Sequence, residues 1–166
     1  MSKTILLLIS LVITSTSWGQ DSLRAVLELY NSKSVPYISV SELRMHQVNG
    51  EVVILDARER EEYEVSHIQG ARFVGYQNFS AEGILDANMD LDAPLVVYCT
   101  LGIRSETIGE KLQKLGFTQV HNLYGGIIAW KNKAYPVIDP EGNETEKVHT
   151  NSRFWGHWLE NGEKVY

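Results

Sequence analysis

Two short apolar runs constrain the fold of this chain more than any other feature of its 166 residues. Residues 51–56 and 95–98 are mostly apolar without alternation, which is typical of strands that are buried on both faces. Helical patterns at 59–65 and 103–115 follow these runs, and another strand-like run lies at 120–123. Because strands that alternate with helices form parallel sheets, the sequence predicts an α/β fold with helices on both faces.

Weaker patterns add shorter elements on either side of these runs. Residues 21–33 have the apolar spacing of an amphipathic helix. Ser39 and Glu42 have the spacing of a capping box, which predicts a short helix that continues to Met45. Further elements are predicted as strands at 37–40 and 71–74 and as a helix at 126–131.

The N-terminus has the pattern of a targeting segment. Lys3 precedes an apolar run over residues 5–13, and the small residues Ser17 and Gly19 follow it where a cleavage site belongs. A membrane-spanning helix needs about 20 apolar residues, and this run is shorter. We therefore expect residues 1–19 to be a signal peptide and the protein to be exported, either to a periplasm or out of the cell.

The charge and the histidines exclude several kinds of partner. The chain has 15 Lys and Arg residues against 21 Asp and Glu residues, for a net charge of −6. An acidic chain without a basic stripe is unsuited to nucleic acid or to an anionic membrane surface. The five histidines have no metal-ligand spacing, so we expect neither a metal site nor a cofactor.

The single cysteine, Cys99, stands where the second buried run passes into a helix. It cannot form an intrachain disulfide, so in an oxidising compartment it is either buried and inert or kept for its reactivity. Sites in parallel sheets form at the carboxyl ends of strands, and this favours a chemical role. Asp56 ends the first buried run, and Arg58 follows it. They are candidates to line the same pocket, although Arg58 could instead form an ion pair that shapes its mouth.

The loop after Cys99 contains what is needed to activate a thiol. The thiolate is the nucleophilic form, and backbone N–H groups before a helix N-terminus can form a nest for its charge. Gly102 allows a tight turn, Arg104 adds positive charge, and Ser105 can donate a hydrogen bond to the sulfur or cap the helix. The candidate substrate-binding residues of this loop are Thr100, Leu101, Gly102, Ile103, Arg104 and Ser105.

Four segments of the chain form an ordered set of motifs. They are Ile54–Glu59, then Glu62–Tyr63 with His67–Ala71, then Cys99–Ser105, and last Tyr124–Trp130. Together they resemble the motifs of single-domain rhodaneses, in which Cys-x-x-Gly-x-Arg-Ser forms the active-site loop. Ala57 stands where that family usually has valine. The resemblance covers about residues 36–135 and does not include the two ends of the chain.

The resemblance implies a rhodanese-like parallel sheet, an active-site loop between a central strand and a helix, and sulfurtransferase activity. In that chemistry the Cys99 thiolate takes the outer sulfur of a donor such as thiosulfate, and a thiophilic acceptor such as cyanide or a thiol removes it. Related phosphatases and arsenate reductases place five residues between cysteine and arginine, whereas four separate Cys99 from Arg104. The smaller ring favours a single sulfur atom over a tetrahedral phosphate.

The parts expected along the chain are a signal peptide at 1–19, an N-terminal helix at 20–35, a rhodanese-like domain at 36–136 and an aromatic-rich extension at 137–166. The extension contains Phe154, Trp155 and Trp158 close together. These rings could pack on the domain or form an exposed patch that docks a partner protein. A second function therefore stays open, that of a rhodanese-like binding module without turnover.

Overall fold

The computed structural model describes residues 22–85 and 89–166, which belong to two compact units that divide after Ser32. In the first unit residues 22–30 form a helix, slightly shorter than the amphipathic spacing predicts. The expected signal peptide lies outside the described residues. Within the described ranges, no helix has the length and apolar character needed to cross a membrane.

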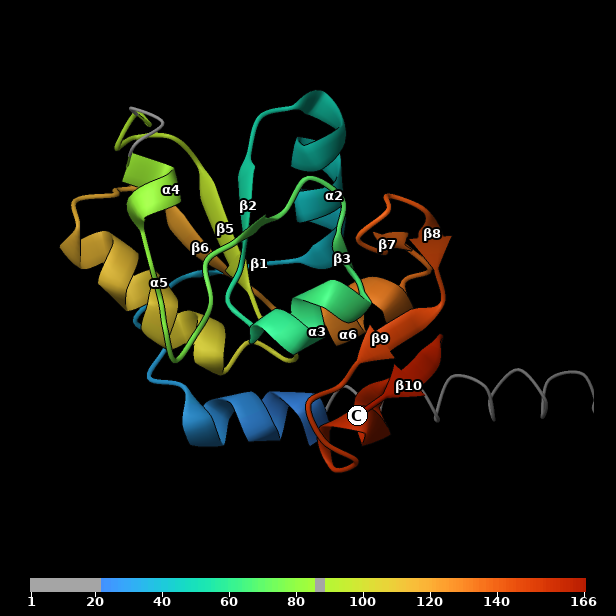
Figure 1. The fold of residues 1–166 in the computed structure, drawn as a ribbon. Helices are drawn as coiled ribbons and strands as arrows, with labels where there is room; N and C mark the ends of the chain where they lie inside the picture. The colour runs from blue at the N-terminus through green and yellow to red at the C-terminus, as the bar shows by residue number, and fades with distance from the viewer. Residues whose placement is uncertain (1–21, 86–88) are drawn as a thin grey trace, which may run out of the picture. The chain divides into compact units, whose positions relative to one another are not determined.

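The second unit is built on a five-stranded sheet in which every strand pair is parallel (Figure 1). In order across the sheet, the strands are β1 (Tyr37–Ile38), β6 (Val120–Leu123), β5 (Leu95–Tyr98), β2 (Val53–Asp56) and β4 (Arg72–Phe73). The two apolar runs become the neighbouring strands β2 and β5, and Asp56 pairs with Tyr98 at their carboxyl ends. This confirms the predicted α/β class and brings the two strand ends together.

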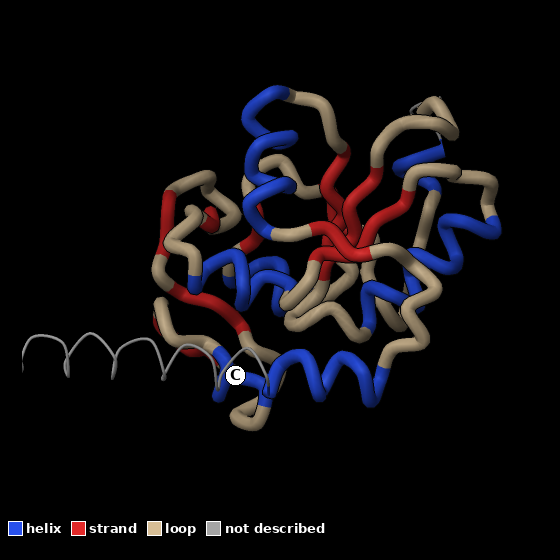
Figure 2. The backbone as a smooth tube through the Cα atoms, turned by 180° about the vertical axis from the view of Figure 1, so that it is seen from behind, coloured by secondary structure: helices blue, strands red, loops and turns tan. Residues whose placement is uncertain are grey.

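Helices cover both faces of the sheet, with α4 and α5 on one side and α2 on the other (Figures 1 and 2). The helices of this unit are α2 (Val40–Asn49), α3 (Arg60–Val65), α4 (Glu82–Leu85), α5 (Arg104–Lys114) and α6 (Gly126–Asn132). Leu95 and Val97 of β5 share one buried cluster with Ile108 and Leu112 of α5. All four residues of β5 are buried, as expected for a strand that is covered on both faces.

Local sequence sets both ends of α2. The Ser39 hydroxyl accepts a hydrogen bond from the Glu42 N–H at 3.2 Å, and the Glu42 carboxylate accepts one from the Ser39 N–H at 3.0 Å. This is the predicted capping box. The helix continues past its predicted end to Asn49, because Gly50 with a φ of 70° is the residue that takes the left-handed conformation at its end.

Residues 137–166 form secondary structure that the sequence patterns did not predict. The elements are β7 (Val137–Ile138), β8 (Glu144–Thr145), β9 (Lys147–His149), the 3₁₀ helix η1 (Trp155–Trp158) and β10 (Glu163–Val165). β7 pairs antiparallel with β3 (His67–Ile68) and with β8, whereas β9 pairs parallel with β10. The Ser66 hydroxyl donates to the Lys147 carbonyl at 2.6 Å, which ties β9 to the end of α3 (Figure 1).

Candidate active site

Cys99 follows β5 directly and is 2% exposed. Its Sγ accepts a hydrogen bond from the Gly102 N–H at 3.2 Å, and the Ser105 hydroxyl lies 3.5 Å from it. Gly102 has a φ of 108°, a conformation that favours glycine and turns the loop back toward the sulfur. The nest expected from the sequence is therefore present, with Gly102 and Ser105 as the donors that reach the sulfur.

Opposing effects act on the pKa of the Cys99 thiol. Burial raises the pKa, whereas the charge of Arg104 and the hydrogen bonds from Ser105 and Gly102 lower it. The lowering effects outweigh burial, so the pKa lies below the usual value of a cysteine. Because the thiolate is the nucleophile, this increases the reactive fraction at neutral pH.

A small pocket of about 100 Å³ lies beside Cys99. Its lining residues are Cys99, Thr100, Leu101, Ile103, Arg104, Asn151 and Trp155. The loop residues among them are the ones that the sequence singled out. Gly102 and Ser105, also singled out, contact the sulfur instead of lining this pocket. Asn151 and Trp155 come from the C-terminal extension, and no sequence motif pointed to them as site residues.

Arg104 lines the pocket but is not an unpaired cation. Its Nη1 donates to Glu62 Oε2 at 2.7 Å, and its Nη2 donates to Glu62 Oε1 and to Thr100 Oγ1, both at 2.8 Å. Burial raises the pKa of Glu62, but the contacts with Arg104, the Glu59 N–H and the charge of Arg58 together lower it by more, so the pair is ionised. The positive charge expected to attract an anionic donor is thus balanced by Glu62. The sequence reasoning quoted Glu62 only as a motif residue and missed this role.

Asp56 and Arg58 are fully buried, and the structure does not bring them to the wall of the pocket. Arg58 Nη2 donates to Asp56 Oδ2 and to the Ser66 carbonyl, both at 2.7 Å. The Tyr98 hydroxyl donates to the same Asp56 oxygen. The expected substrate contact is therefore replaced by a supporting role, because this buried ion pair holds Tyr98, the residue directly before Cys99.

Asn122 of β6 supports the Cys99 loop through hydrogen bonds, a role that the sequence analysis did not predict. Its Nδ2 donates to the Gly102 carbonyl at 2.8 Å, and its Oδ1 accepts from the Ser105 hydroxyl at 2.8 Å. The Ser105 hydroxyl has one proton, so it can donate either to Asn122 or to the sulfur at any moment. A polar residue inside a buried strand needs partners, so the Asn122 amide was a signal available in the sequence.

The Gly125-Gly126 pair allows α6 to approach the loop. The Ile127 N–H donates to the Cys99 carbonyl at 3.0 Å, and the Ile128 N–H donates to the Thr100 carbonyl at 3.3 Å. Gly126 has a φ of 56°, and a Cβ atom there would overlap the Cys99 carbonyl. Only glycine permits this close approach, which uses the otherwise unpaired N–H groups of a helix start.

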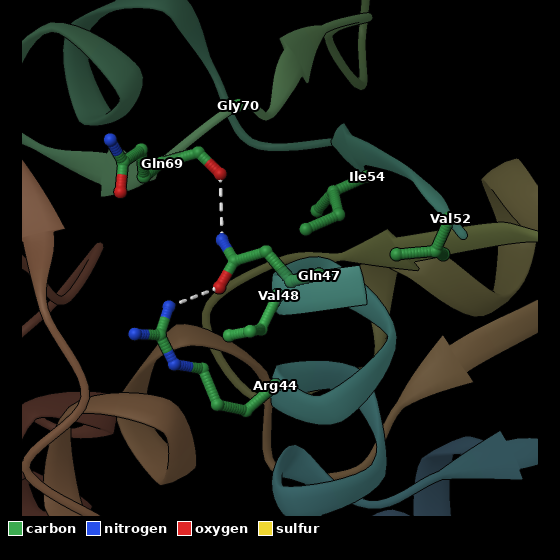
Figure 3. A pocket seen from close by; sticks show the side chains of 7 residues that line it. All are labelled: Arg44, Gln47, Val48, Val52, Ile54, Gln69 and Gly70. Atoms are coloured by element: carbon green, nitrogen blue, oxygen red, sulfur yellow. Dashed lines mark hydrogen bonds between the residues drawn. The ribbon is translucent and has the colours of Figure 1, made fainter. Parts of the chain in front are cut away.

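A second, larger cavity of about 400 Å³ shares no lining residue with the Cys99 pocket. Figure 3 shows its lining residues, Arg44, Gln47, Val48, Val52, Ile54, Gln69 and Gly70. Gln47 donates to the Gln69 carbonyl and accepts from Arg44, and these residues include no nucleophile. In the part of the chain that the structure describes, no cluster of His, Cys, Asp or Glu is placed to hold a metal ion.

The fold and the loop define a class of protein, an α/β domain with an activated cysteine at the carboxyl end of a central strand. Sequence comparison agrees with this class. The Rhodanese-like domain family matches residues 39–133, more than half of the chain, and the chain belongs to this family.

Two kinds of curated relative match the same region. One is the thiosulfate sulfurtransferase GlpE of Pseudomonas fluorescens, 36% identical over 91 residues, which are 55% of this chain and 80% of that relative. The other is the tRNA uridine(34) hydroxylase of Listeria welshimeri, 37% identical over 97 residues, which are 57% of this chain. The match spans only 30% of the hydroxylase's length.

Solved structures support the fold. A thiosulfate sulfurtransferase from Pseudomonas aeruginosa has a TM-score of 0.60 and 24% identity, covering 70% of this chain and 23% of that one. The BH2092 protein of Bacillus halodurans has a TM-score of 0.56 and 21% identity, covering 72% of this chain and 88% of that one. The rhodanese fold expected from the four motifs is thereby confirmed.

Proposed function

We propose that this protein is a sulfurtransferase that carries sulfane sulfur as a persulfide on Cys99. The observation that carries the proposal is the set of donors around the sulfur, the Gly102 N–H at 3.2 Å and the Ser105 hydroxyl at 3.5 Å, beside the charge of Arg104. Donors that stabilise a thiolate also stabilise the persulfide anion that replaces it. The family and its sulfurtransferase relatives support the same reading.

The proposed reaction uses the Cys99 sulfur and the hydrogen-bond donors of this loop. The Cys99 thiolate attacks the outer sulfur of thiosulfate, the sulfur–sulfur bond breaks, and its electron pair leaves with sulfite. Cys99 then holds a persulfide anion. A thiophile such as cyanide attacks the terminal sulfur, thiocyanate leaves, and the thiolate is restored. The Gly102 N–H donates to Cys99 Sγ and so stabilises the thiolate at the start and at the end of the cycle.

Two features of the loop disfavour phosphatase chemistry. Four residues separate Cys99 from Arg104, which makes a tight ring. The two terminal nitrogens of the Arg104 guanidinium, Nη1 and Nη2, also donate to Glu62, so this edge of the guanidinium is not available to bind a phosphate.

Intact-mass spectrometry tests the proposal directly. Residues 20–166 are incubated with thiosulfate and then with cyanide, and Cys99→Ser is the control. The proposal expects a gain of one sulfur atom that requires Cys99 and is removed by cyanide. No gain with thiosulfate, polysulfide or mercaptopyruvate would favour the alternative, a binding module that docks a partner through the aromatic residues of its extension.

We also propose that residues 1–19 direct export to a periplasm or out of the cell. The apolar run and the small residues after it support this. Expression with and without residues 1–19, followed by fractionation and N-terminal sequencing of the product, tests it. A product that keeps Met1 and stays in the cytoplasm would contradict the proposal.

A further inference from the structure

The C-terminal extension supplies part of the pocket that holds the reactive sulfur. Asn151 and Trp155 line it together with the Cys99 loop, and both lie beyond residues 39–133, where the family match ends. The family domain alone therefore leaves one side of this pocket unbuilt. A side chain that an added segment places in the wall of this pocket is positioned to influence which donor fits.

The segment that carries Asn151 and Trp155 is held firmly in place. The Thr150 N–H donates to the Val165 carbonyl at 2.9 Å, next to the β9–β10 pairing, and Thr150 is fully buried. A Cβ atom on Gly156 would lie 2.9 Å from Thr150 Oγ1, so η1 packs closely on this residue. This close packing of Gly156 on Thr150 supports the neighbouring Trp155 in the wall of the pocket.

The pocket does not favour a doubly charged donor. Among its lining residues Arg104 is the only cation, and Glu62 balances its charge through contacts of 2.7 and 2.8 Å. His149, two residues before Asn151, is uncharged at neutral pH because burial lowers its pKa. The Cys99 thiolate adds a negative charge of its own. The pocket therefore offers no unbalanced positive charge to a donor, whereas thiosulfate carries two negative charges.

The remaining wall favours an apolar substituent. Leu101, Ile103 and Trp155 line the pocket, and they face a space of only about 100 Å³. A methyl group removed from water against such side chains gains about fivefold in binding. The space therefore suits a small organic group better than a third sulfonate oxygen.

We infer that Trp155 and Asn151 complete the donor pocket and make this protein select small organic thiosulfonates, which carry one negative charge, over thiosulfate. The inference rests on the proposed function and names its donor class. The Cys99 thiolate attacks the sulfane sulfur of R–SO₂–S⁻, the sulfur–sulfur bond breaks, and its electron pair leaves with the sulfinate R–SO₂⁻. Two negative charges stand on each side, and no oxidant or reductant is required.

Methanethiosulfonate and thiosulfate are a matched pair of probes, because they differ by a methyl group in place of one charged oxygen. Steady-state thiocyanate formation gives kcat/KM for each donor. The ratio of kcat/KM for methanethiosulfonate to kcat/KM for thiosulfate is then divided by the ratio of the rate constants with which a small free thiolate attacks the same two donors. The corrected ratio is independent of the fraction of folded enzyme. We expect it to exceed about 10 for the native chain, a preference that one charge and one methyl contact can supply.

Variants then assign the preference to the extension. Trp155→Ala should lower the corrected ratio about fivefold, and Trp155→Phe should keep it within about twofold, because a ring still covers the methyl group. Phe154→Ala is the control, since Phe154 belongs to the same aromatic cluster, is 63% exposed and does not line the pocket. Its ratio should stay unchanged.

The outcomes separate this inference from the proposed function. A corrected ratio near 1, or a ratio that Trp155→Ala leaves unchanged, would overturn the donor selection while a Cys99 persulfide seen by mass spectrometry still supports sulfur transfer. Failure of both donors to load Cys99 would overturn the proposed function and this inference together.

Discussion

Arg104 and Glu62 form a bidentate ion pair beside Cys99, with N–O distances of 2.7 and 2.8 Å. The pair places a guanidinium near the sulfur, where its charge lowers the pKa of the thiol. It also balances that charge toward a donor that enters the pocket. The same guanidinium therefore activates the nucleophile, while Glu62 weakens its attraction for an anionic substrate.

Replacing Glu62 with Gln should increase the use of thiosulfate. The substitution releases the charge of Arg104, so kcat/KM for thiosulfate should rise about tenfold, for ~1.4 kcal/mol of charge interaction. The pKa of Cys99 should fall further. The same change leaves a partly buried guanidinium without its carboxylate and should lower stability by about 2 kcal/mol in urea unfolding. Unchanged or weaker thiosulfate use by the folded variant would show that Glu62 does not limit the charge of the pocket.

The rate at which iodoacetamide alkylates Cys99 should depend on pH with a midpoint below about 8.5, the ordinary value for cysteine. The lowered pKa in the folded state has a consequence for stability. The thiolate stabilises the fold fully above the pKa of the unfolded chain, and this contribution is lost as pH falls through the lower folded pKa. Relative to Cys99→Ser, the native chain should therefore gain stability between these two pKa values as pH rises.

Ser105→Ala should move the alkylation midpoint upward, because the hydroxyl that lowers the pKa of Cys99 is removed. The variant also leaves Asn122 Oδ1 without its donor, which should cost about 1 kcal/mol of stability. A midpoint that stays in place would mean that the hydroxyl donates to Asn122 only and that Gly102 and Arg104 activate the thiol without it.

Gly126→Ala should disrupt the loop more than backbone strain alone explains. Gly126 and Gly50 both have positive φ, 56° and 70°, but a Cβ atom on Gly50 meets nothing within 4 Å. Gly50→Ala is therefore the matched control, with an expected loss of about 1 kcal/mol. Gly126→Ala should lose at least about 3 kcal/mol and slow alkylation of Cys99, because the Cys99 carbonyl must move. Equal losses in urea unfolding would contradict the close approach.

Asp56→Asn separates a supporting role from substrate binding. The substitution leaves the buried Arg58 guanidinium without a carboxylate and should lower stability by about 3 kcal/mol. The folded fraction should still form the Cys99 persulfide at a rate within about twofold of the native chain. A large loss of sulfur transfer with unchanged stability would place Asp56 in contact with the donor after all.

Strong local patterns made the central elements predictable. The continuous apolar run at 95–98 located β5 at its observed bounds, and the strand-like run at 120–123 located β6. The helical pattern at 103–115 located α5 to within one residue at each end. The strands of the C-terminal extension have two or three residues each. Strands this short have too few positions for a period to appear, and only their pairing partners stabilise them.

The residues of the site were also predictable only where they lie close together in the sequence. The order Cys99, Gly102, Arg104, Ser105 predicted a loop that can hold a sulfur anion, because these residues lie within seven consecutive positions of the chain. The pairing of Arg104 with Glu62 and the support from Asn122 connect residues that are far apart in the sequence. No local pattern encodes such contacts.

The sequence by itself determined the α/β class, the position of the Cys99 loop and the family motifs, since these depend on hydrophobic period and on neighbours along the chain. Only the tertiary structure decided that Asp56 and Arg58 support the loop from a buried position, that Glu62 balances Arg104, and that Trp155 lines the pocket. The physical reason is that burial and charge balance depend on which distant segments pack together, and the chain sets this only when it folds.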